Sequence, residues 1–257
     1  MNRKALIAMS GGVDSAVSAY LMKERGYDCI GVTMRLYREA DPDLPQEQSC
    51  CTTDDVEDAR KVARSIGIPH ELVNFSDLFC EKVVDPFVDA YEHGRTPNPC
   101  VDCNRYLKFE KLFQHAAELG CDHVVTGHYV QTEYDEQTGR YLLKKGLDPS
   151  KDQSYVLYSL TQDQLSHAIF PLGGMTKEEA RSLAEQQGFV NARKHDSQDI
   201  CFIPDGKYAE FIERYTGKHY PEGSFVDGAG TVLGQHRGII RYTIGQRKGL
   251  GLSLKGS

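Results

Sequence analysis

The sequence lacks any run of eighteen consecutive apolar residues, although 40% of its 257 residues are hydrophobic. A run of about that length is needed to cross a membrane, so we expect no transmembrane helix and no membrane partner. Residues 1–4 lead directly into an apolar stretch, without the cleavage pattern of a signal peptide. Internal repeats and low-complexity segments are also absent. These absences indicate a cytoplasmic protein, and its length of 257 residues is enough for one full domain and a smaller one.

Acidic residues are absent from residues 228–257, although the whole chain carries a net charge of −7. The segment itself carries five basic residues, so the rest of the chain has a net charge of −12, which is −7 minus +5. They are Arg237, Arg241, Arg247, Lys248 and Lys255. A basic tail on an acidic body is compatible with a local polyanion site. Charge alone supports the solvated surface of a β-hairpin equally well.

The motif Ser10–Ser15 follows the apolar run Ala5–Met9 and precedes a helical pattern. A glycine turn between a strand and a helix can form a nest of backbone N–H groups facing a phosphate. The motif lacks the Gly-Lys-Ser/Thr ending of a Walker loop and the third glycine of a dinucleotide fingerprint. Ser-Gly-Gly-x-Asp-Ser instead resembles the PP-loop of ATP pyrophosphatases, which cleave ATP between the α and β phosphates. The alternative is a glycine-rich turn that binds nothing.

Apolar strands alternate with helical patterns over the first half of the chain, which predicts an α/β fold with a doubly wound parallel sheet. The strands are expected at residues 5–9, 29–34, 71–75 and 123–126, and the helices at 15–25, 54–66 and about 106–119. Nucleotides bind at the carboxyl ends of strands in such sheets. Beyond Gly127 we expect a hairpin of residues 129–133 and 140–145, helices near 162–167 and 177–187, and a small β unit from Tyr220 onward.

Eight cysteines in a cytoplasmic chain indicate redox or metal chemistry rather than structural disulfides. Cys100 and Cys103 precede a helix expected to begin near Asn104, where the helix dipole and two basic residues, Arg105 and Lys108, favour a thiolate. That is the setting of a nucleophile. Cys201, within the segment Asp196–Ile203, is the second candidate for a reactive cysteine.

Metal binding is the usual alternative for a Cys-x-x-Cys motif. A zinc site is disfavoured, because no second Cys-x-x-Cys or spaced histidine pair completes it and the adjacent Cys50 and Cys51 are a poor ligand pair. An iron–sulfur cluster held by Cys100, Cys103 and Cys201 remains open, although it is not favoured.

Six motifs in the correct order resemble one family, the bacterial tRNA-specific 2-thiouridylases, from Ala8 to about Leu252. The motifs are residues 10–15, 96–109, 126–129, 151–155, 196–203 and 242–251. The resemblance implies an adenine nucleotide α-hydrolase-like PP-loop domain at residues 1–203 and a small, partly β central domain contacting tRNA at 204–257. The family usually continues into a C-terminal β-barrel, which we expect this chain to lack.

The resemblance also implies roles for individual residues. Cys103 matches the nucleophile and Cys201 the persulfide-carrying cysteine, and the two form a transient disulfide. The residues that match ATP contacts are Ala8, Met9, Ser10, Gly11, Gly12, Val13, Asp14, Ser15, Met34 and Gly127. Those that match the target base or tRNA contacts are Asn98, Pro99, Cys100, His128, Lys151, Asp152 and Gln153. Some family members carry aspartate, proposed as a catalytic acid/base, in place of Cys100. Asp102 is offset from that position and is not assigned this role, so Cys100 is left as a residue without a role, a ligand or a resolving thiol.

The implied reaction replaces the C2 oxygen of the wobble uridine by sulfur, with ATP consumed to AMP and pyrophosphate. Adenylation makes the oxygen a leaving group, and Mg²⁺ near Asp14 neutralises the polyphosphate. A persulfide supplied by a sulfur-carrier protein or a cysteine desulfurase then delivers sulfur, and the second thiol releases it. Two other functions remain as alternatives: a PP-loop amidoligase or synthetase acting on a small molecule, and a non-catalytic RNA-binding or iron–sulfur module.

Overall fold

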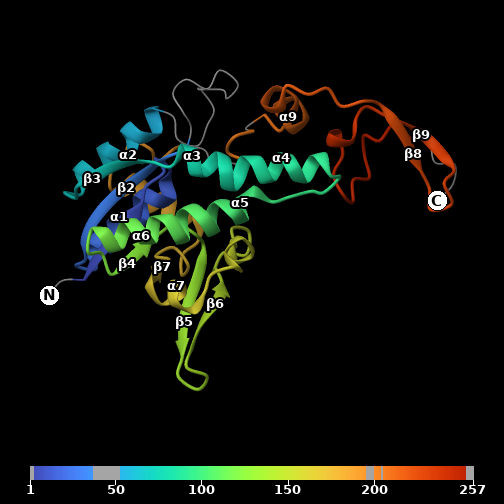
Figure 1. Ribbon diagram of the computed structural model, residues 1–257. Helices are drawn as coiled ribbons and strands as arrows, with labels where there is room; N and C mark the ends of the chain where they lie inside the picture. Colours follow the sequence, from blue (N-terminus) through green and yellow to red (C-terminus); the bar gives the residue numbers. More distant parts are fainter. Residues whose placement is uncertain (1–2, 37–52, 195–199, 204, 253–257) are drawn as a thin grey trace.

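A parallel sheet of five strands forms the centre of the protein, in a computed structural model that describes residues 3–36, 53–194, 200–203 and 205–252 (Figure 1). The strand order is β3-β2-β1-β4-β7. The strands are β1 (Lys4–Ala8), β2 (Asp28–Arg35), β3 (His70–Asn74), β4 (His123–Val125) and β7 (Ala168–Ile169). Four of them lie where the sequence predicts, which confirms the α/β fold with its parallel sheet. The fifth, β7, is only two residues long and was not predicted.

Helices cover both faces of the sheet, so it is doubly wound as predicted. Successive side chains of a strand point to opposite faces, and those of β1 alternate between two buried clusters. Ala5 and Ile7 pack with α1 (Val13–Glu24), α2 (Thr53–Ser65) and α8 (Lys177–Gln186). Leu6 packs on the other face with side chains of two long helices.

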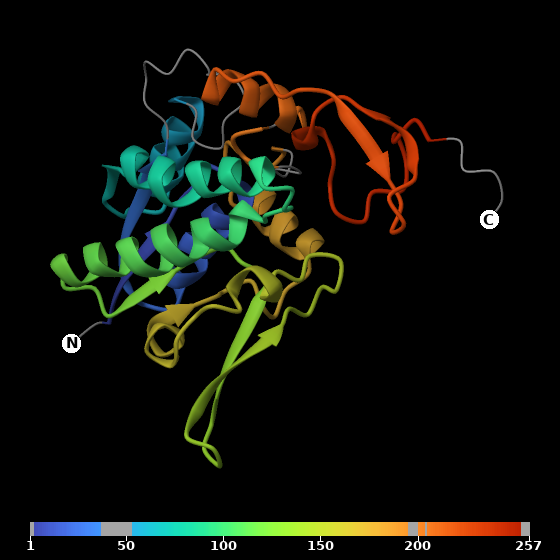
Figure 2. The same ribbon diagram turned by 45° about the vertical axis from the view of Figure 1, so that its right-hand side comes forward.

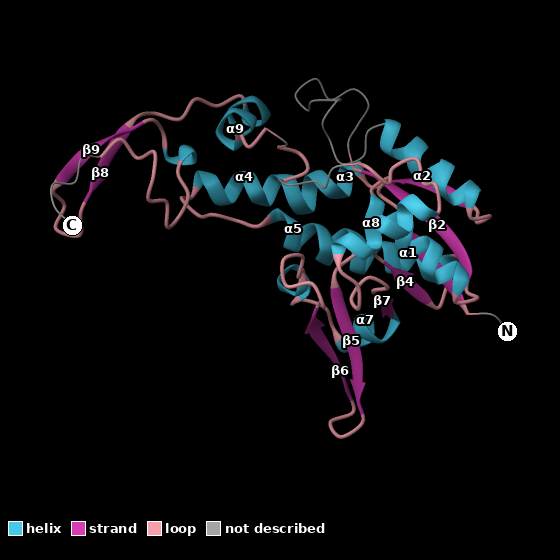
Figure 3. Ribbon diagram, turned by 180° about the vertical axis from the view of Figure 1, so that it is seen from behind, coloured by secondary structure: helices cyan, strands magenta, loops and turns pink. Residues whose placement is uncertain are grey.

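These two helices each contain a π-helical stretch between regular segments. The first comprises α3 (Ser76–Phe79), a π-helical stretch (Cys80–Val84) and α4 (Asp85–Glu92). The second comprises α5 (Pro99–Asp102), a π-helical stretch (Cys103–Lys111) and α6 (Leu112–Glu118). They run side by side across the molecule in the opposing views of Figures 1 and 3. The sequence predicted the second helix from residue 106 and did not predict the first.

The hairpin beyond Gly127 is present as predicted. It consists of β5 (Val130–Asp135) and β6 (Arg140–Lys145), paired antiparallel with Val130 opposite Lys145. A 3₁₀ turn (Ser154–Leu157), α7 (Gln162–His167) and then β7 lead back to the sheet. The hairpin projects away from the sheet (Figure 2).

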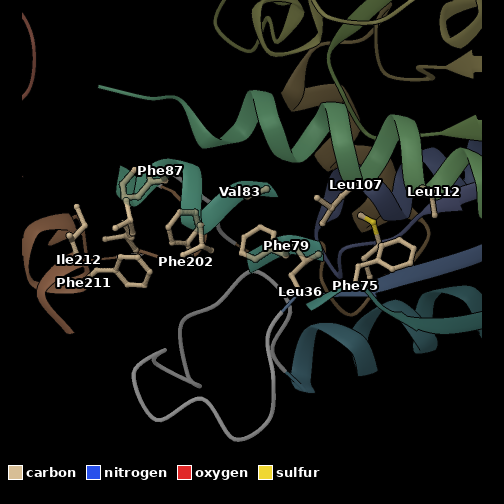
Figure 4. Close-up of a cluster of buried hydrophobic side chains, with 14 of the residues drawn as sticks. Leu36, Phe75, Phe79, Val83, Phe87, Leu107, Leu112, Phe202, Phe211 and Ile212 are labelled. Carbon is tan, nitrogen blue, oxygen red and sulfur yellow. The ribbon is translucent and has the colours of Figure 1, made fainter. Parts of the chain in front are cut away.

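The C-terminal part contains α9 (Tyr208–Thr216), the antiparallel pair β8 (Gly223–Val226) and β9 (Val232–His236), and a 3₁₀ turn (Ile239–Arg241). The predicted β structure beyond Tyr220 is therefore present, whereas α9 was not predicted. One buried cluster runs from Leu36 and Phe75 beside the sheet, along α4, to Phe211 and Ile212 of α9 (Figure 4). This cluster holds the C-terminal part against the long helix formed by α3, the π-helical stretch and α4.

No helix in the described part of the chain is long and apolar enough to span a membrane. Cys50, Cys51, Asp196–Asp199 and Lys255, which the sequence analysis singled out, lie outside the described residues.

Candidate active site

The Ser10–Ser15 loop joins β1 to α1 and leaves the first turn of that helix open. The Ser15 hydroxyl accepts from the Ser10 N–H at 3.2 Å and donates to the Gly12 carbonyl at 3.0 Å. Gly12 is the N-cap of α1 and offers no side chain to its N–H groups. The first N–H groups of a helix have no partner within it, so they are available to an anion. The geometry therefore agrees with a phosphate nest.

Glycine is required at two places around this loop. Gly11 has a φ of +77°, and a Cβ there would lie 2.3 Å from the Asp55 carbonyl oxygen. Gly127 follows β4, and its Cβ would lie 2.9 Å from the backbone carbon of Asp14. Ala8, Met9 and Met34 lie at the ends of β1 and β2, the neighbouring strands of the sheet. The residues expected to contact ATP thus gather at the carboxyl ends of three adjacent strands.

Asp14 is held by two groups that the sequence did not connect with it. Its carboxylate accepts from the Lys177 ammonium at 2.8 and 2.9 Å and from the Tyr129 hydroxyl at 2.8 Å. The Lys177 side chain is 11% exposed and that of Asp14 is 32% exposed. Mg²⁺ is usually bound by one or two carboxylates together with substrate phosphates. Asp14 fits that pattern once phosphates are present, but the lysine competes for its oxygens.

The thiol-bearing helix begins earlier than predicted. Its N-cap is Asn98, whose side chain accepts from the Cys100 N–H at 3.1 Å, and Pro99 occupies the first turn. Cys100 therefore lies in the first turn and is exposed, whereas Cys103 lies a turn further on and is partly buried. The expectation that the helix begins near Asn104 is wrong, because an Asn-Pro pair caps and starts a helix.

Burial decides the protonation of Cys103. Loss of hydration raises the pKa of the Cys103 thiol to about 12, and the neighbouring Lys108 lowers it by less than burial raises it. The expectation that this position favours a thiolate is therefore wrong for the resting protein. Although the Cys100 residue is exposed, the protein around its thiol removes part of the hydration of the sulfur and raises the pKa, and Lys108 again opposes this. In this state both cysteines are protonated near neutral pH.

The three candidate cysteines lie close enough to influence one another. Cys201 raises the pKa of both Cys100 and Cys103 through its charge. Cys103 and Cys201 also pack against one buried cluster, which contains Met34 at the end of β2. Candidate thiols from two distant segments of the sequence are thus brought together.

Metal ligation by these thiols is not supported by their placement. Within the described ranges, no three His, Cys, Asp or Glu side chains are grouped so that they could hold a metal ion. Cys100, Cys103 and Cys201 all belong to those ranges. The described residues therefore do not indicate a cluster held by these three thiols.

His128 is a buried neutral histidine. Loss of hydration, and to a lesser degree the charge of Lys108, hold the pKa of His128 well below its usual range. Its Nδ1 lies 2.7 Å from the Thr126 hydroxyl, and the Phe109 and Phe170 rings flank it at 6.2 Å. A neutral imidazole among aromatic rings can stack or hydrogen-bond but adds no positive charge for RNA.

The Lys151–Gln153 segment is a tightly bonded loop beside α5. The Asp152 carboxylate accepts from the Gly146 N–H and from the Ser154 hydroxyl, at 3.1 and 2.8 Å. Gln153 accepts from the Tyr129 N–H at 3.1 Å. The 3₁₀ turn that follows packs against α5. Asp152 and Gln153 therefore hold the loop in place beside α5. Their contacts with tRNA stay a prediction.

The acid-free C-terminal segment contributes less positive charge than its composition suggests. The Arg241 guanidinium is paired with Glu210 at 3.1 Å and with Glu213 at 2.9 Å, so its charge is offset. Arg247 and Lys248 are exposed.

Comparison with known proteins supports this assembly of motifs. The family model described as tRNA methyl transferase HUP domain matches residues 3–205, and that described as tRNA methyl transferase PRC-barrel domain matches residues 209–257. The tRNA-specific 2-thiouridylase MnmA of Clostridioides difficile (strain 630) is 51% identical over 253 residues, which are 98% of this chain and 70% of that protein. MnmA 1 of Caldanaerobacter subterraneus subsp. tengcongensis is 56% identical over 257 residues, with the same coverage. The chain belongs to the tRNA-specific 2-thiouridylase family.

A solved 4-thiouridine synthetase in complex with RNA and ATP shares the fold of this tRNA-specific 2-thiouridylase family member. The two match with a TM-score of 0.51 and 22% identity over 82% of this chain and 50% of that one. At this identity the likeness shows the fold alone.

Sequence reasoning missed the partners that hold the 2-thiouridylase motifs. Tyr129 and Lys177 bind Asp14, while Asn191 and Lys194 reach the Gly11 carbonyl. A capping box in the sequence marks the start of α8 at Lys177. It does not indicate which carboxylate the Lys177 ammonium binds. The pairings join residues more than a hundred positions apart, and no local pattern indicates them.

Proposed function

We propose that this protein catalyses the ATP-dependent 2-thiolation of the wobble uridine of tRNA, giving 2-thiouridine, AMP and pyrophosphate. The observation that carries the proposal is the mutual electrostatic influence of Cys100, Cys103 and Cys201, in a chain that also has a PP-loop geometry and belongs to the 2-thiouridylase family. A PP-loop activates an oxygen, and a pair of thiols replaces it by sulfur. The combination has no evident use in a synthetase that joins small molecules.

The first half of the reaction takes place at the PP-loop. The uridine C2 oxygen attacks the α-phosphorus of ATP, and pyrophosphate leaves. The Gly12 N–H and the first turn of α1 face the phosphates, where fixed donors stabilise developing negative charge. When bound, Mg²⁺ would neutralise the polyphosphate with Asp14 as its ligand.

The second half uses the thiols. The terminal sulfur of a Cys201 persulfide attacks C2, and the C2–O bond breaks so that AMP leaves with the oxygen. Cys103 then attacks the Cys201 sulfur, which releases thiouridine and leaves a Cys103–Cys201 disulfide. A reductant must restore the two thiols, and a sulfur-carrier protein or cysteine desulfurase must restore the persulfide. Since Cys103 is protonated at rest, its proton has to be removed once the substrates are bound.

The tRNA is expected to reach the thiols over the Lys151–Gln153 loop and α5. The uridine must leave its stack to enter this region, which costs a few kcal/mol and less in a loop. Asn98, Pro99, Cys100 and His128 would then surround the base. We expect these events to take place in the cytoplasm.

The experiment is nucleoside mass spectrometry of unmodified tRNA after incubation with the protein, ATP, Mg²⁺ and a persulfide donor. We expect 2-thiouridine with the natural chain, none with Cys103→Ser or Cys201→Ser, and an undiminished yield with the matched control Cys121→Ser. Full thiolation by Cys103→Ser would refute the proposed mechanism. Exchange of pyrophosphate into ATP with a small acid or amine and no RNA would favour the amidoligase alternative instead.

A further inference from the structure

The Gly11–Gly12 peptide of the PP-loop is held from behind by a buried side chain. Asn191 is 2% exposed, and its Nδ2 donates to the Gly11 carbonyl oxygen at 2.9 Å. Two buried neighbours, Phe189 and Ala192, anchor the same segment in the cluster that contains α1 and α8. The Asn191 amide is therefore a fixed donor and does not lie on a mobile surface loop.

A second contact comes from Lys194, three residues further on. Its ammonium is 2.6 Å from the Asp55 carboxylate and 2.9 Å from that of Asp58, both on α2, and 3.5 Å from the Gly11 oxygen. The two ion pairs fix the segment to α2 and place a positive charge beside the same carbonyl. Asn191 thus makes the close contact, and Lys194 supports it.

This carbonyl matters because of the geometry of a peptide unit. In a trans peptide the C=O and the following N–H point in opposite directions, and no cis peptide is present among the described residues. Holding the Gly11 C=O toward Asn191 therefore turns the Gly12 N–H toward the opposite side, where the first turn of α1 is open. The Gly12 N–H donates to no group of the described chain.

The loop cannot fix this peptide by itself. Glycine adopts positive and negative φ with similar ease, so rotation of a peptide between two glycines meets little steric resistance. A rotated peptide would present the Gly11 carbonyl oxygen, instead of the Gly12 N–H, to the phosphates. Negative charge would then face negative charge at the position where the nest requires a donor.

We propose that Asn191, supported by Lys194, is a positioning residue that orients the Gly12 N–H toward the phosphates of ATP. The inference rests on the proposed function only in that the PP-loop binds a nucleoside triphosphate. It concerns phosphate binding and needs neither tRNA nor the thiols.

The test compares the binding of Mg-ATP and of adenosine by calorimetry, using the whole chain. Asn191→Leu keeps the approximate size of the side chain and removes the donor. The Asn191 Oδ1, which is buried without a hydrogen-bond partner in the described structure, is removed as well. Removal of that unpaired oxygen offsets part of the stability lost with the Nδ2 hydrogen bond to Gly11, so the variant should still fold with a melting temperature close to the natural one. Arg193→Met is the matched control, since the Arg193 side chain is 91% exposed.

For Asn191→Leu we expect the Kd for ATP to rise about tenfold, or about 1.4 kcal/mol, while the Kd for adenosine changes less than about twofold. Lys194→Met should shift the ATP Kd in the same direction by a smaller factor, and Arg193→Met should leave both constants unchanged. An unchanged ATP Kd in Asn191→Leu would overturn the inference, as would equal losses for ATP and adenosine. If the natural protein itself binds ATP no better than adenosine, the phosphate role of the loop fails, and with it the proposed function.

Discussion

Protonation of Cys103 can be tested through the pH dependence of its alkylation. An ordinary cysteine has a pKa of about 8.5, whereas burial raises that of Cys103 to about 12. At pH 8 the thiolate fraction of Cys103 should accordingly be about three orders of magnitude below that of an exposed thiol. In a Cys100→Ser background, mass spectrometry of iodoacetamide-treated protein should show a rate that still rises tenfold per pH unit at pH 10. A plateau near pH 9 would refute the assignment of burial as the dominant cause.

The contribution of Lys108 can be separated from burial by substitution. Its positive charge lowers the pKa of Cys103. Lys108→Met should therefore raise that pKa, and at every pH below the pKa of the natural protein the variant should be alkylated more slowly than the natural protein. Lys111→Met is the matched control, because that ammonium bonds to Gln114 and does not act on the thiol. Faster alkylation in Lys108→Met would mean that the lysine shields the thiol sterically, and that its charge is of minor importance there.

Three further predictions concern the contributions of Gly11, Lys177 and Cys29 to the stability of the folded protein. Gly11→Ala should cost about 2 kcal/mol or more in urea unfolding, since φ is +77° and the Cβ would overlap the Asp55 carbonyl. Lys177→Met should cost about 1–2 kcal/mol in the same assay, less than the 3–5 kcal/mol typical of a fully buried pair because Asp14 is 32% exposed. Burial raises the pKa of Cys29 to about 11, so the unfolded chain loses this thiol proton at a lower pH than the folded protein does. The resulting contribution to the free energy of unfolding is complete below pH 9 and is lost as the pH rises toward 11. Cys29→Ala should flatten the fall of unfolding free energy over that interval, and an unchanged slope would contradict this.

Local patterns predicted the part of the fold that depends on neighbours in the sequence. A strand, a glycine turn and a helix identify the PP-loop because their conformations follow from residues 5–25 alone. The helix from Ser76 to Glu92 was missed, although it is as long as others that were found. Pro86 lies inside it, just after the π-helical stretch Cys80–Val84. A proline that usually marks a boundary is here accommodated within a continuous helix.

The chemistry of the site depends on contacts that no local pattern contains. Asp14 and Lys177 are 163 positions apart, and Asn191 and Gly11 are 180 apart. The pKa of Cys103 was misjudged for the same reason. Its basic neighbours are visible in the sequence, whereas the buried cluster that covers it comes from several distant elements. The start of its helix, by contrast, could have been predicted from Asn98 and Pro99.

One long-range contact joins two motifs whose relation the sequence left open. The Ile244 N–H donates to the Thr96 hydroxyl at 2.9 Å, which ties the Tyr242–Gly251 loop to the segment that leads into α5. Since Arg241 is neutralised by two glutamates, the positive charge that this loop can offer a polyanion comes from Arg247 and Lys248. Phosphate contacts position a nucleic acid without reading its sequence. Cations on a loop bonded to Thr96 would therefore hold an RNA backbone near the segment that leads into α5, and we expect side chains of α5 to take part in the choice of base.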